Sequence, residues 1–404
     1  MLKKIGVEHL KLGMHLHELC GPWMDHPFWR SKFVLQDEAD LRRIVDSGIT
    51  EVWIDVEKGL DVVDARVEAE VHAEVEKTLA KVAPSSAAPQ RVSVAEEVRR
   101  ASKICANGKQ AVISMFQEAR MGKAIAAESA GRLVDEIASS VMRNPGALIS
   151  LARLKSADDY TYMHSLAVSA LMVAMGRQMK LDDATVRELG LAGLMHDIGK
   201  VRTPLTVLNK PGKLTDAEFD IIKGHPTSGY ELLLESHTAS KIVLDVCLHH
   251  HEKVGGGGYP ERLQTEQISM YAKMGAVCDV YDAITSNRPY KPGWDPAESI
   301  KKMTEWCKGH FDEQVFQGFV KSMGIYPTGS LVRLESGRLA IVVEQSAKSL
   351  LSPCVKVFFS TKAQTHIKPE SIDLSRPGAN DRIVGREDPV KWGFKNLERL
   401  WAMA

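Results

Sequence analysis

The sequence predicts a multidomain, mainly α-helical protein with small β-containing units at its two ends. At 404 residues the chain is long enough for two or three domains. Apolar residues recur with helical spacing through most of residues 147–323. Strand-like alternation is confined to residues 1–60 and to a stretch that begins near Ile325. We therefore expect an all-helical central domain, a small N-terminal α/β or β-rich domain and a small C-terminal β appendage.

The N-terminal unit, residues 1–82, is predicted to be a β-rich domain followed by a helix. Val7–Leu19 alternates in polarity with a break at Gly13, and Glu51–Val56 alternates and is rich in β-branched residues. Gln36–Ser47 is expected to form a short helix between these strands. Local histidines could form a second metal site, although polar positions on a half-exposed strand explain them more simply. These histidines are His9, His15, His17 and His26.

The pattern then becomes helical. Valines at positions 63, 67, 71 and 75 of Val62–Leu79 make one narrow apolar stripe on a charged helix. We interpret the stripe as packing against the next domain, with a dimer seam as the alternative. After a linker containing Pro and Ser, two amphipathic helices, Ser93–Glu118 and Ala124–Arg143, lead to the central domain. The predicted units are, in order, residues 1–82, 83–92, 93–146, 147–323 and 324–404.

The C-terminal unit is predicted to be a small β structure. Three strand-like runs, Ser330–Leu334, Leu339–Val343 and Cys354–Phe359, are separated by segments containing Gly, Ser and Pro. We expect the β structure to end near residue 375 and a tail to follow it.

Composition argues against several classes of function. The formal net charge is zero, which disfavours binding to long nucleic acids or anionic membranes but allows a small anionic ligand held by local cations. The six cysteines are scattered, so a disulfide framework is not expected. The N-terminus lacks a signal-peptide core, and the longest apolar helix, around Leu166–Met175, is too short to span a bilayer. We therefore expect a cytoplasmic protein.

The stretch Leu191–Lys200, which reads L-A-G-L-M-H-D-I-G-K, is the centre of the predicted site. His196 and Asp197 stand side by side at the end of an apolar helical run. Histidine supplies a nitrogen ligand, and a carboxylate can bridge two cations through its two oxygens. The pair alone is a weak signal, but half of the 14 histidines fall between His164 and His251. This clustering suggests metal binding.

Several polar residues are predicted to point inward from separate helices near this pair. Asp279 shares a helix face with Ala272 and Gly275, and His196 shares one with Leu189. Unpaired polar groups on such faces are costly to bury, so these groups must satisfy one another. Two divalent cations would satisfy them at once. The candidate ligands are His164, His196, Asp197, His225, His250, His251 and Asp279.

The residue types fit a two-metal site. Two metals about 3.5–4 Å apart can share a carboxylate and a hydroxide, and the hydroxide is a nucleophile near neutral pH. Asp197 is the natural bridge between them. The expected ligand sets are His164, His196 and Asp279 for one metal, and His225, His250 and His251 for the other. Mixed nitrogen and oxygen ligation suits Fe, Mn, Ni, Co or Zn and does not choose among them.

Further polar groups follow the last histidines. The glycines of Gly255–Gly258 allow a backbone to approach a ligand closely, or form only a flexible loop. Asp282 follows Asp279 by one helical turn, and Arg288 and Lys291 lie just beyond the helix end. Two cations beside a metal pair would clamp phosphate oxygens, with a solvated charged loop as the alternative.

Together these residues resemble the HD-GYP family, a branch of the HD phosphohydrolases. The motifs that carry the resemblance are Tyr160-Thr-Tyr-Met-His164-Ser, His196-Asp-Ile-Gly-Lys200, Lys210-Pro-Gly-Lys-Leu, His225-Pro, His250-His-Glu252, Gly258-Tyr-Pro260, Asp279-Val-Tyr-Asp-Ala and Arg288-Pro-Tyr-Lys291. The resemblance implies an all-helical HD-type metal domain that hydrolyses cyclic di-GMP to linear pGpG, and in some members on to GMP.

The resemblance also implies roles for individual residues. The seven candidate ligands match the family's metal ligands position by position. Asp197 and Lys200 would be catalytic, with Lys200 a donor of the proton to the leaving oxygen. Lys200, Arg288 and Lys291 would contact the substrate phosphate. At the N-terminus, a second set of residues resembles the uncharacterised domain often found ahead of HD-GYP domains, without implying a chemistry. This set is Leu12-Gly-Met14, Trp23, His26-Pro-Phe28 and Val52-Trp-Ile-Asp55.

Two departures from the family pattern matter. Some members hold a third metal through a glutamate one turn before the first histidine, where this chain has Tyr160, so we expect two metals. The family also usually has an aspartate where this chain has Gly255, which would weaken turnover or the recruitment of signalling proteins.

Two alternative functions therefore stay open. One is a catalytically weak cyclic-dinucleotide sensor, and the other is a phosphohydrolase for another cyclic dinucleotide. The expected partners are cyclic di-GMP, a second copy bound through the helical region, and other signalling proteins.

Overall fold

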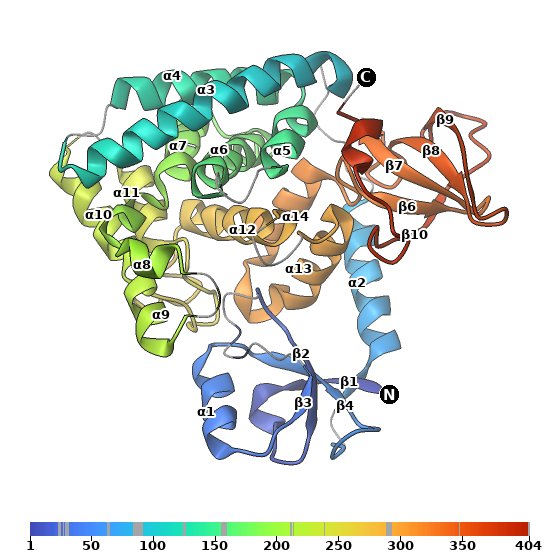
Figure 1. Ribbon diagram of the computed structural model, residues 1–404, viewed down its shortest axis with the longest axis horizontal. Helices are drawn as coiled ribbons and strands as arrows, with labels where there is room; N and C mark the ends of the chain where they lie inside the picture. Colours follow the sequence, from blue (N-terminus) through green and yellow to red (C-terminus); the bar gives the residue numbers. More distant parts are fainter. Residues whose placement is uncertain are drawn as a thin grey trace.

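In the computed structural model of this protein, a body of helices carries two small sheets, one at the bottom and one at the right of Figure 1. The described residues are 1–22, 26, 28, 32–62, 65–83, 92–123, 127–154, 160–210, 212, 214–237, 239–287, 293–346 and 348–402. The predicted fold class, multidomain and mainly α-helical with a small sheet at each end, is confirmed. Among the helices of this described part, none is both long and apolar enough to cross a membrane.

The N-terminal sheet is antiparallel and covers its own small core. Its strands have the order β3-β2-β4-β1-β5, and helix α1 packs beside them. The bounds are β1 Leu2–Gly6, β2 His15–Leu19, β3 Phe33–Val34, α1 Glu38–Asp46, β4 Glu51–Asp55 and β5 Arg66–Val67. Leu16, Ile44 and Val52 are fully buried between α1 and the sheet.

The predicted strand over Val7–Leu19 is only partly correct. Val7–His9 forms a short 3-10 helix, and strand β2 begins at His15. Gly13 has φ of 89°, so the chain turns there before β2 pairs with β4. Among the described residues, the groups able to hold a metal do not include the histidines of this domain.

Helix α2, Glu68–Val82, leads from the N-terminal sheet to the helical body (Figure 1). The helix predicted over Val62–Leu79 therefore begins later than expected, because Val67 pairs with β1 in strand β5; residue 63 lies outside the described residues. Val71 and Val75 are buried in the main core with residues of the central domain. The apolar stripe thus packs against the next domain.

The helical body is built around α6, which is largely apolar and buried along most of its length. Leu166, Val168 and Met172 of α6 are completely buried, as expected for a helix surrounded by other helices. The helices are α3 Val94–Arg120, α4 Ala127–Arg143, α5 Pro145–Arg153, α6 Tyr160–Gln178, α7 Asp183–Met195, η3 Ile198–Arg202, α8 Leu205–Leu208, α9 Asp216–Lys223, α10 His225–Glu235, α11 Lys241–His249, α12 Met270–Thr285, α13 Pro296–His310 and α14 Glu313–Met323. Helices α3 and α4 share this core, so they belong to the body itself.

A buried ion pair joins α3 to α4. The Glu97 side chain is fully buried and accepts hydrogen bonds from Ser140 Oγ at 2.9 Å and from Arg143 Nε and Nη2 at 2.7 Å each. Burial alone would raise the pKa of Glu97 above its ordinary value of 4.5, but the Arg143 and Ser140 hydrogen bonds lower it. The carboxylate is therefore bound in its charged form.

We expect Glu97→Ala to destabilise the protein by about 3 kcal/mol, because Arg143 and Ser140 would lose their buried partner. The exposed pair Glu128–Arg132 on α4 gives the matched control, and Glu128→Ala should cost about 0.5 kcal/mol or less. Because the folded-state pKa of Glu97 is depressed, its contribution is present above pH 4.5 and is lost as the pH falls through the lowered value. Denaturant unfolding of both variants and of the unchanged protein at pH 7 and pH 3.5 measures the free energy of unfolding. If Glu97→Ala lowers it equally at both pH values, the charged Glu97 does not stabilise the fold.

The C-terminal sheet is antiparallel with the order β10-β6-β7-β8-β9. Its strands are β6 Leu331–Leu334, β7 Arg338–Glu344, β8 Cys354–Ser360, β9 Thr365–Asp373 and β10 Ile383–Arg386, and η4 Leu397–Leu400 follows. The first three match the predicted runs. The predicted end near residue 375 is wrong, because β10 pairs with β6 beyond it.

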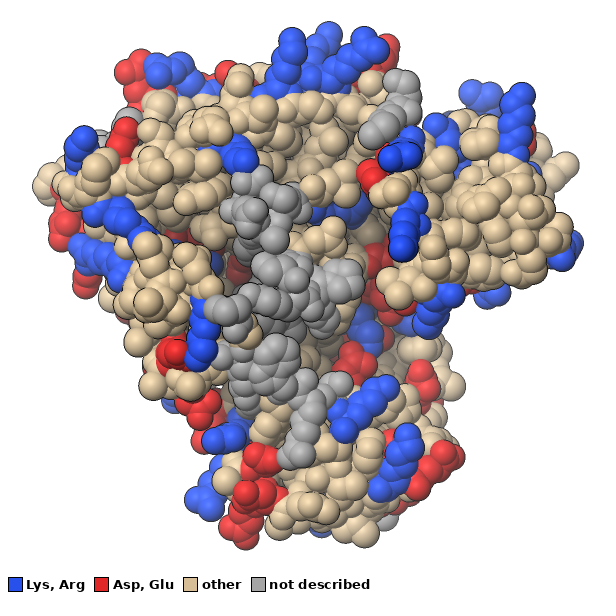
Figure 2. Space-filling model, in the orientation of Figure 1, with Lys and Arg blue, Asp and Glu red and all other residues tan. Residues whose placement is uncertain are grey.

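Acidic and basic side chains are intermixed over the face of the molecule seen in Figure 2, as expected from a net charge of zero.

Candidate metal centre

The fold brings all seven candidate ligands together in the helical body. They come from α6, from the ends of α7 and α11, from the start of α10 and from the middle of α12. All are buried except His251, which is partly buried. The seven are His164, His196, Asp197, His225, His250, His251 and Asp279.

Among the described residues, the ligand atoms form three groups of three, each with all its atoms within 4.8 Å of one another. One group, His196, Asp197 and His250, joins the other two, which share no residue and which we call the two clusters. The clusters are His164, His196 and Asp279, and His225, His250 and His251. They coincide with the two ligand sets expected from the sequence. Three donors within this distance are enough to hold a cation whose remaining positions take water or substrate.

Asp197 lies between the two clusters. Its Oδ1 is 3.1 Å from Nε2 of His225 and 3.9 Å from Nε2 of His250. Its Oδ2 faces the other cluster, at 3.5 Å from Nε2 of His196 and 3.7 Å from Nε2 of His164. A carboxylate with one oxygen toward each cluster has the geometry of a bridging ligand.

The helix ends orient three of the histidines. His196, His225 and His250 each place Nδ1 near the backbone carbonyl three residues earlier, at 2.8, 2.7 and 3.0 Å. When Nδ1–H donates to that carbonyl, Nε2 keeps its lone pair and points to the centre. Metal-binding histidines usually have their second nitrogen fixed in this way.

Asp282 orients the fourth histidine. Its Oδ2 lies 2.6 Å from Nδ1 of His164, whose Nε2 lies 2.9 Å from Oδ1 of Asp279. Burial opposes protonation of His164, but the hydrogen bonds with Asp279 and Asp282 outweigh it and raise its pKa. No role for Asp282 was predicted from the sequence, although its position one helical turn after Asp279 is the signal that points to it.

The centre gathers acceptor atoms that repel one another without a cation. Nε2 of His225 and Nε2 of His250 are 3.2 Å apart, and both face Oδ1 of Asp197. If their Nδ1–H groups donate to the backbone, none of these three atoms carries a proton to share. Nε2 of His196 is likewise buried without a hydrogen bond. Divalent cations would satisfy all of these atoms, so the residues fit a metal centre.

At several of these residues the electrostatics favour the form that binds a metal, whereas the raised pKa of His164 favours its protonated form. Burial lowers the pKa of His196, and it lowers the pKa of His250 to about 3, so both are neutral. Burial would raise the pKa of Asp197, but the nearby Lys200 ammonium outweighs burial and brings it well below its usual value. The pKa of Asp279 is lowered in the same way, by its hydrogen bond with His164. Neutral imidazoles and charged carboxylates are the states that bind metals.

The predicted substrate contacts are only partly described. Lys200 follows the His-Asp pair in η3, with Nζ 2.5 Å from Oδ2 of Asp197 and a side chain about one-fifth exposed, at 22%. It can therefore reach both the centre and a bound ligand. Arg288 and Lys291 lie outside the described residues, and so does the side chain of Tyr160.

The glycine loop, Gly255–Gly258, folds directly against the centre. The Tyr259 ring stacks on the His251 ring at 4.6 Å, and Tyr259 N–H donates to the His251 carbonyl at 3.2 Å. A Cβ at Gly258 would lie 2.4 Å from the Lys253 backbone nitrogen, so only glycine allows this close return of the chain. The loop is therefore packed against His251 of the candidate metal centre.

The structure explains why position 255 is a glycine in this chain. Its N–H donates to the Gly309 carbonyl at 3.0 Å, and a Cβ at Gly255 would lie 2.9 Å from that oxygen. The aspartate expected here from the family pattern would force the last turn of α13 away from the loop.

The fold and donor set define an HD-domain protein, a helical protein with a central His-Asp pair among further histidines and carboxylates. Family models described as an HD domain and as a domain of unknown function (DUF3391) match residues 135–315 and 2–130. The chain is 56% identical to the cyclic di-GMP phosphodiesterase PA4108 of Pseudomonas aeruginosa, covering 99% of this chain and 96% of that protein. The chain therefore belongs to the HD-GYP family, and the expected N-terminal domain is confirmed.

Two further similarities cover less or are more distant. The chain is 34% identical over 168 residues to the 3′3′-cGAMP-specific phosphodiesterase 1 of Vibrio cholerae, covering 41% of this chain and 39% of that protein. A solved structure described as the HDG"Y"P protein Bd1817 from Bdellovibrio bacteriovorus has a TM-score of 0.46 at 18% identity, covering 79% of this chain and 98% of that one.

Proposed function

We propose that this protein is a metal-dependent phosphodiesterase that hydrolyses cyclic di-GMP to linear pGpG, with GMP as a further product to be tested. The observation that carries the proposal is the pair of ligand clusters that meet at the two oxygens of Asp197. The relative with 56% identity over nearly the whole chain is named for this activity, which supports cyclic di-GMP as the substrate.

The chain's own residues supply positioning, charge and a proton. Two divalent cations held at the clusters would activate water as a nucleophile and neutralise phosphate charge. Asp197 keeps the two clusters at a fixed separation. Lys200, whose Nζ lies beside Asp197, is proposed to contact a phosphate oxygen and to protonate the leaving 3′-oxygen. Arg288 and Lys291 are proposed to bind the remaining phosphate oxygens.

Lys200 gives a test of this division of roles. We expect Lys200→Met to lower kcat by about 10²- to 10⁴-fold, the range for loss of a general acid. Lys200→Arg keeps the positive charge but does not release a proton near neutral pH, so KM should recover while kcat stays low. Steady-state kinetics of both variants separate the roles; recovery of kcat by Arg would show that Lys200 acts through charge alone.

A nucleotide panel separates the proposed function from its alternatives. The purified, metal-loaded protein is incubated with cyclic di-GMP, 3′3′-cGAMP and cyclic di-AMP, and products are followed by chromatography. Fastest turnover of cyclic di-GMP, with pGpG appearing first, supports the proposal. Faster turnover of 3′3′-cGAMP would favour the activity named for the Vibrio relative. Tight binding of cyclic di-GMP without any product would instead make the protein a sensor.

The other expectations stay predictions. They are two metals per chain, drawn from Fe, Mn, Ni, Co or Zn, a homodimer through the helical region, contacts with signalling proteins, and a cytoplasmic location.

A further inference from the structure

The N-terminal domain touches the glycine loop through a backbone-to-backbone contact. Gly48 follows α1 with φ of 72°, and a Cβ there would lie 2.6 Å from the carbonyl oxygen of Gly257. A Cβ at Gly257 would in turn lie 3.3 Å from the Cα of Gly48. Two chain segments meet here at a distance that only glycine allows.

The N-terminal sheet also contacts helix α13. Lys4, whose side chain is 1% exposed, pairs with Glu51 at 2.6 Å and donates to the carbonyl of Glu305 on α13 at 3.0 Å. Lys302 of α13 pairs with Glu18 of β2 at 2.9 Å. These buried and half-buried contacts join α13 to the sheet of the N-terminal domain. Separating the two would leave a buried charge without its partner, which is energetically unfavourable.

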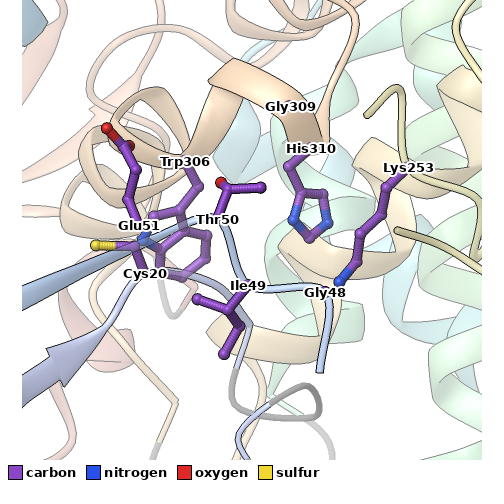
Figure 3. Close-up of a pocket in the computed structure, with 9 residues that line it drawn as sticks. All are labelled: Cys20, Gly48, Ile49, Thr50, Glu51, Lys253, Trp306, Gly309 and His310. Carbon is purple, nitrogen blue, oxygen red and sulfur yellow. The ribbon is translucent and has the colours of Figure 1, made fainter. Parts of the chain in front are cut away.

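The C-terminal end of α13 contacts both the glycine loop and the N-terminal domain. Gly309 accepts the hydrogen bond from Gly255, and a Cβ at Gly309 would lie 3.6 Å from Cγ2 of Thr50. Figure 3 shows the seam between the domains, with the Lys253 side chain extending toward Gly48 and the His310 ring beside it. The loop is therefore backed on its outer side by residues of both the N-terminal domain and α13.

The inner side of the loop is tied to a candidate ligand. Besides the Tyr259 contacts with His251, the buried Glu252 carboxylate accepts the N–H groups of Glu261 at 2.7 Å and Leu263 at 3.0 Å. A displacement of the loop would consequently move the ring that stacks on His251.

We propose that the N-terminal domain positions the metal centre: the contact between Gly48 and Gly257, supported by α13, holds the loop so that Tyr259 fixes the His251 ring. Gly48 is a positioning residue in this arrangement. Withdrawal of the N-terminal domain loosens the cluster of His225, His250 and His251. The proposal rests on the metal centre and on no particular nucleotide.

Hydrogen–deuterium exchange on the full chain tests this with Gly48→Asn. Asn tolerates positive φ, so the turn after α1 can persist, but its Cβ still collides with Gly257. We expect amides of residues 255–263 to exchange at least about tenfold faster. The affinity for metal should fall by about 10-fold, as when an outer partner of a ligand is lost. Gly122→Asn is the matched control, because Gly122 has φ of 69° and a Cβ there meets nothing within 4 Å.

Each outcome decides the proposal. Faster loop exchange together with weaker metal binding in Gly48→Asn alone supports it, including the case in which the N-terminal domain itself opens. Faster loop exchange with an unchanged affinity for metal overturns it, because the contact would then hold the loop without positioning the metal centre. Unchanged loop exchange overturns it whether or not that domain opens, and equal acceleration in Gly122→Asn overturns it as a general destabilisation. Exchange is measured without nucleotide, so a protein that fails to hydrolyse cyclic di-GMP would contradict the proposed function and leave this test intact.

Discussion

Asp197→Asn should lower the turnover of cyclic di-GMP by about 10³-fold or more, which corresponds to about 4 kcal/mol of activation free energy. The asparagine keeps the shape of the side chain but offers one oxygen without charge. It therefore cannot serve both clusters, which the two carboxylate oxygens approach at 3.1 and 3.5 Å. Metal content should fall below that of the unchanged protein, because a shared ligand is lost from both clusters.

The matched control is Asp220→Asn, which alters an exposed aspartate on α9 that pairs with Lys223. It should leave metal content and kcat unchanged. Elemental analysis and steady-state kinetics of both variants measure the difference. If Asp197→Asn keeps its full metal content and its activity, then Asp197 is not the bridge.

Asp282→Ala should weaken metal binding by about 10- to 100-fold, although Asp282 is not itself one of the clustered ligands. Its carboxylate holds Nδ1 of His164 at 2.6 Å and so directs Nε2 to the centre. Asp282→Asn retains an oxygen that can accept the same hydrogen bond, so we expect an intermediate loss. Competition against a chelator of known affinity measures both variants.

A neighbouring pair provides the control for Asp282. Asp245 holds Nδ1 of His249 at 2.8 Å in a similar arrangement, but His249 belongs to neither ligand cluster. Asp245→Ala should therefore leave metal affinity unchanged. Equal losses from Asp245→Ala and Asp282→Ala would show that the effect is general destabilisation and not the orientation of one ligand.

The candidate ligands could be predicted from the sequence because they are polar side chains on apolar helix faces, where a polar side chain needs a buried partner. A histidine or aspartate on an apolar helix face must find a buried partner, and helical spacing indicates which faces turn inward. Asp279 on α12 and His196 at the end of α7 were identified in this way. Adjacency in the sequence places His250 and His251 at one helix end, whereas the grouping of His164, His196 and Asp279 depends on how three helices pack.

Contacts between distant segments could not be predicted in the same way. The approach of Gly48 to Gly257 depends on how two domains dock. Nothing in the sequence around either glycine indicates that it contacts the other. Strand β9 was missed because most of its residues are exposed, so it lacks the alternation of a half-buried strand. The start of α2 was misplaced because Val67 fits a strand and a helix equally, and pairing with β1 decides between them.

Anomalous scattering from crystals of the metal-loaded protein would show whether Asp197 bridges two metals. Maps recorded at the absorption edge of the bound metal should show two peaks, one beside His164, His196 and Asp279 and the other beside His225, His250 and His251. The Asp197 carboxylate should lie between them with one oxygen toward each. A single peak, or two peaks with Asp197 bound to only one, would show that this protein has no two-metal centre bridged by Asp197.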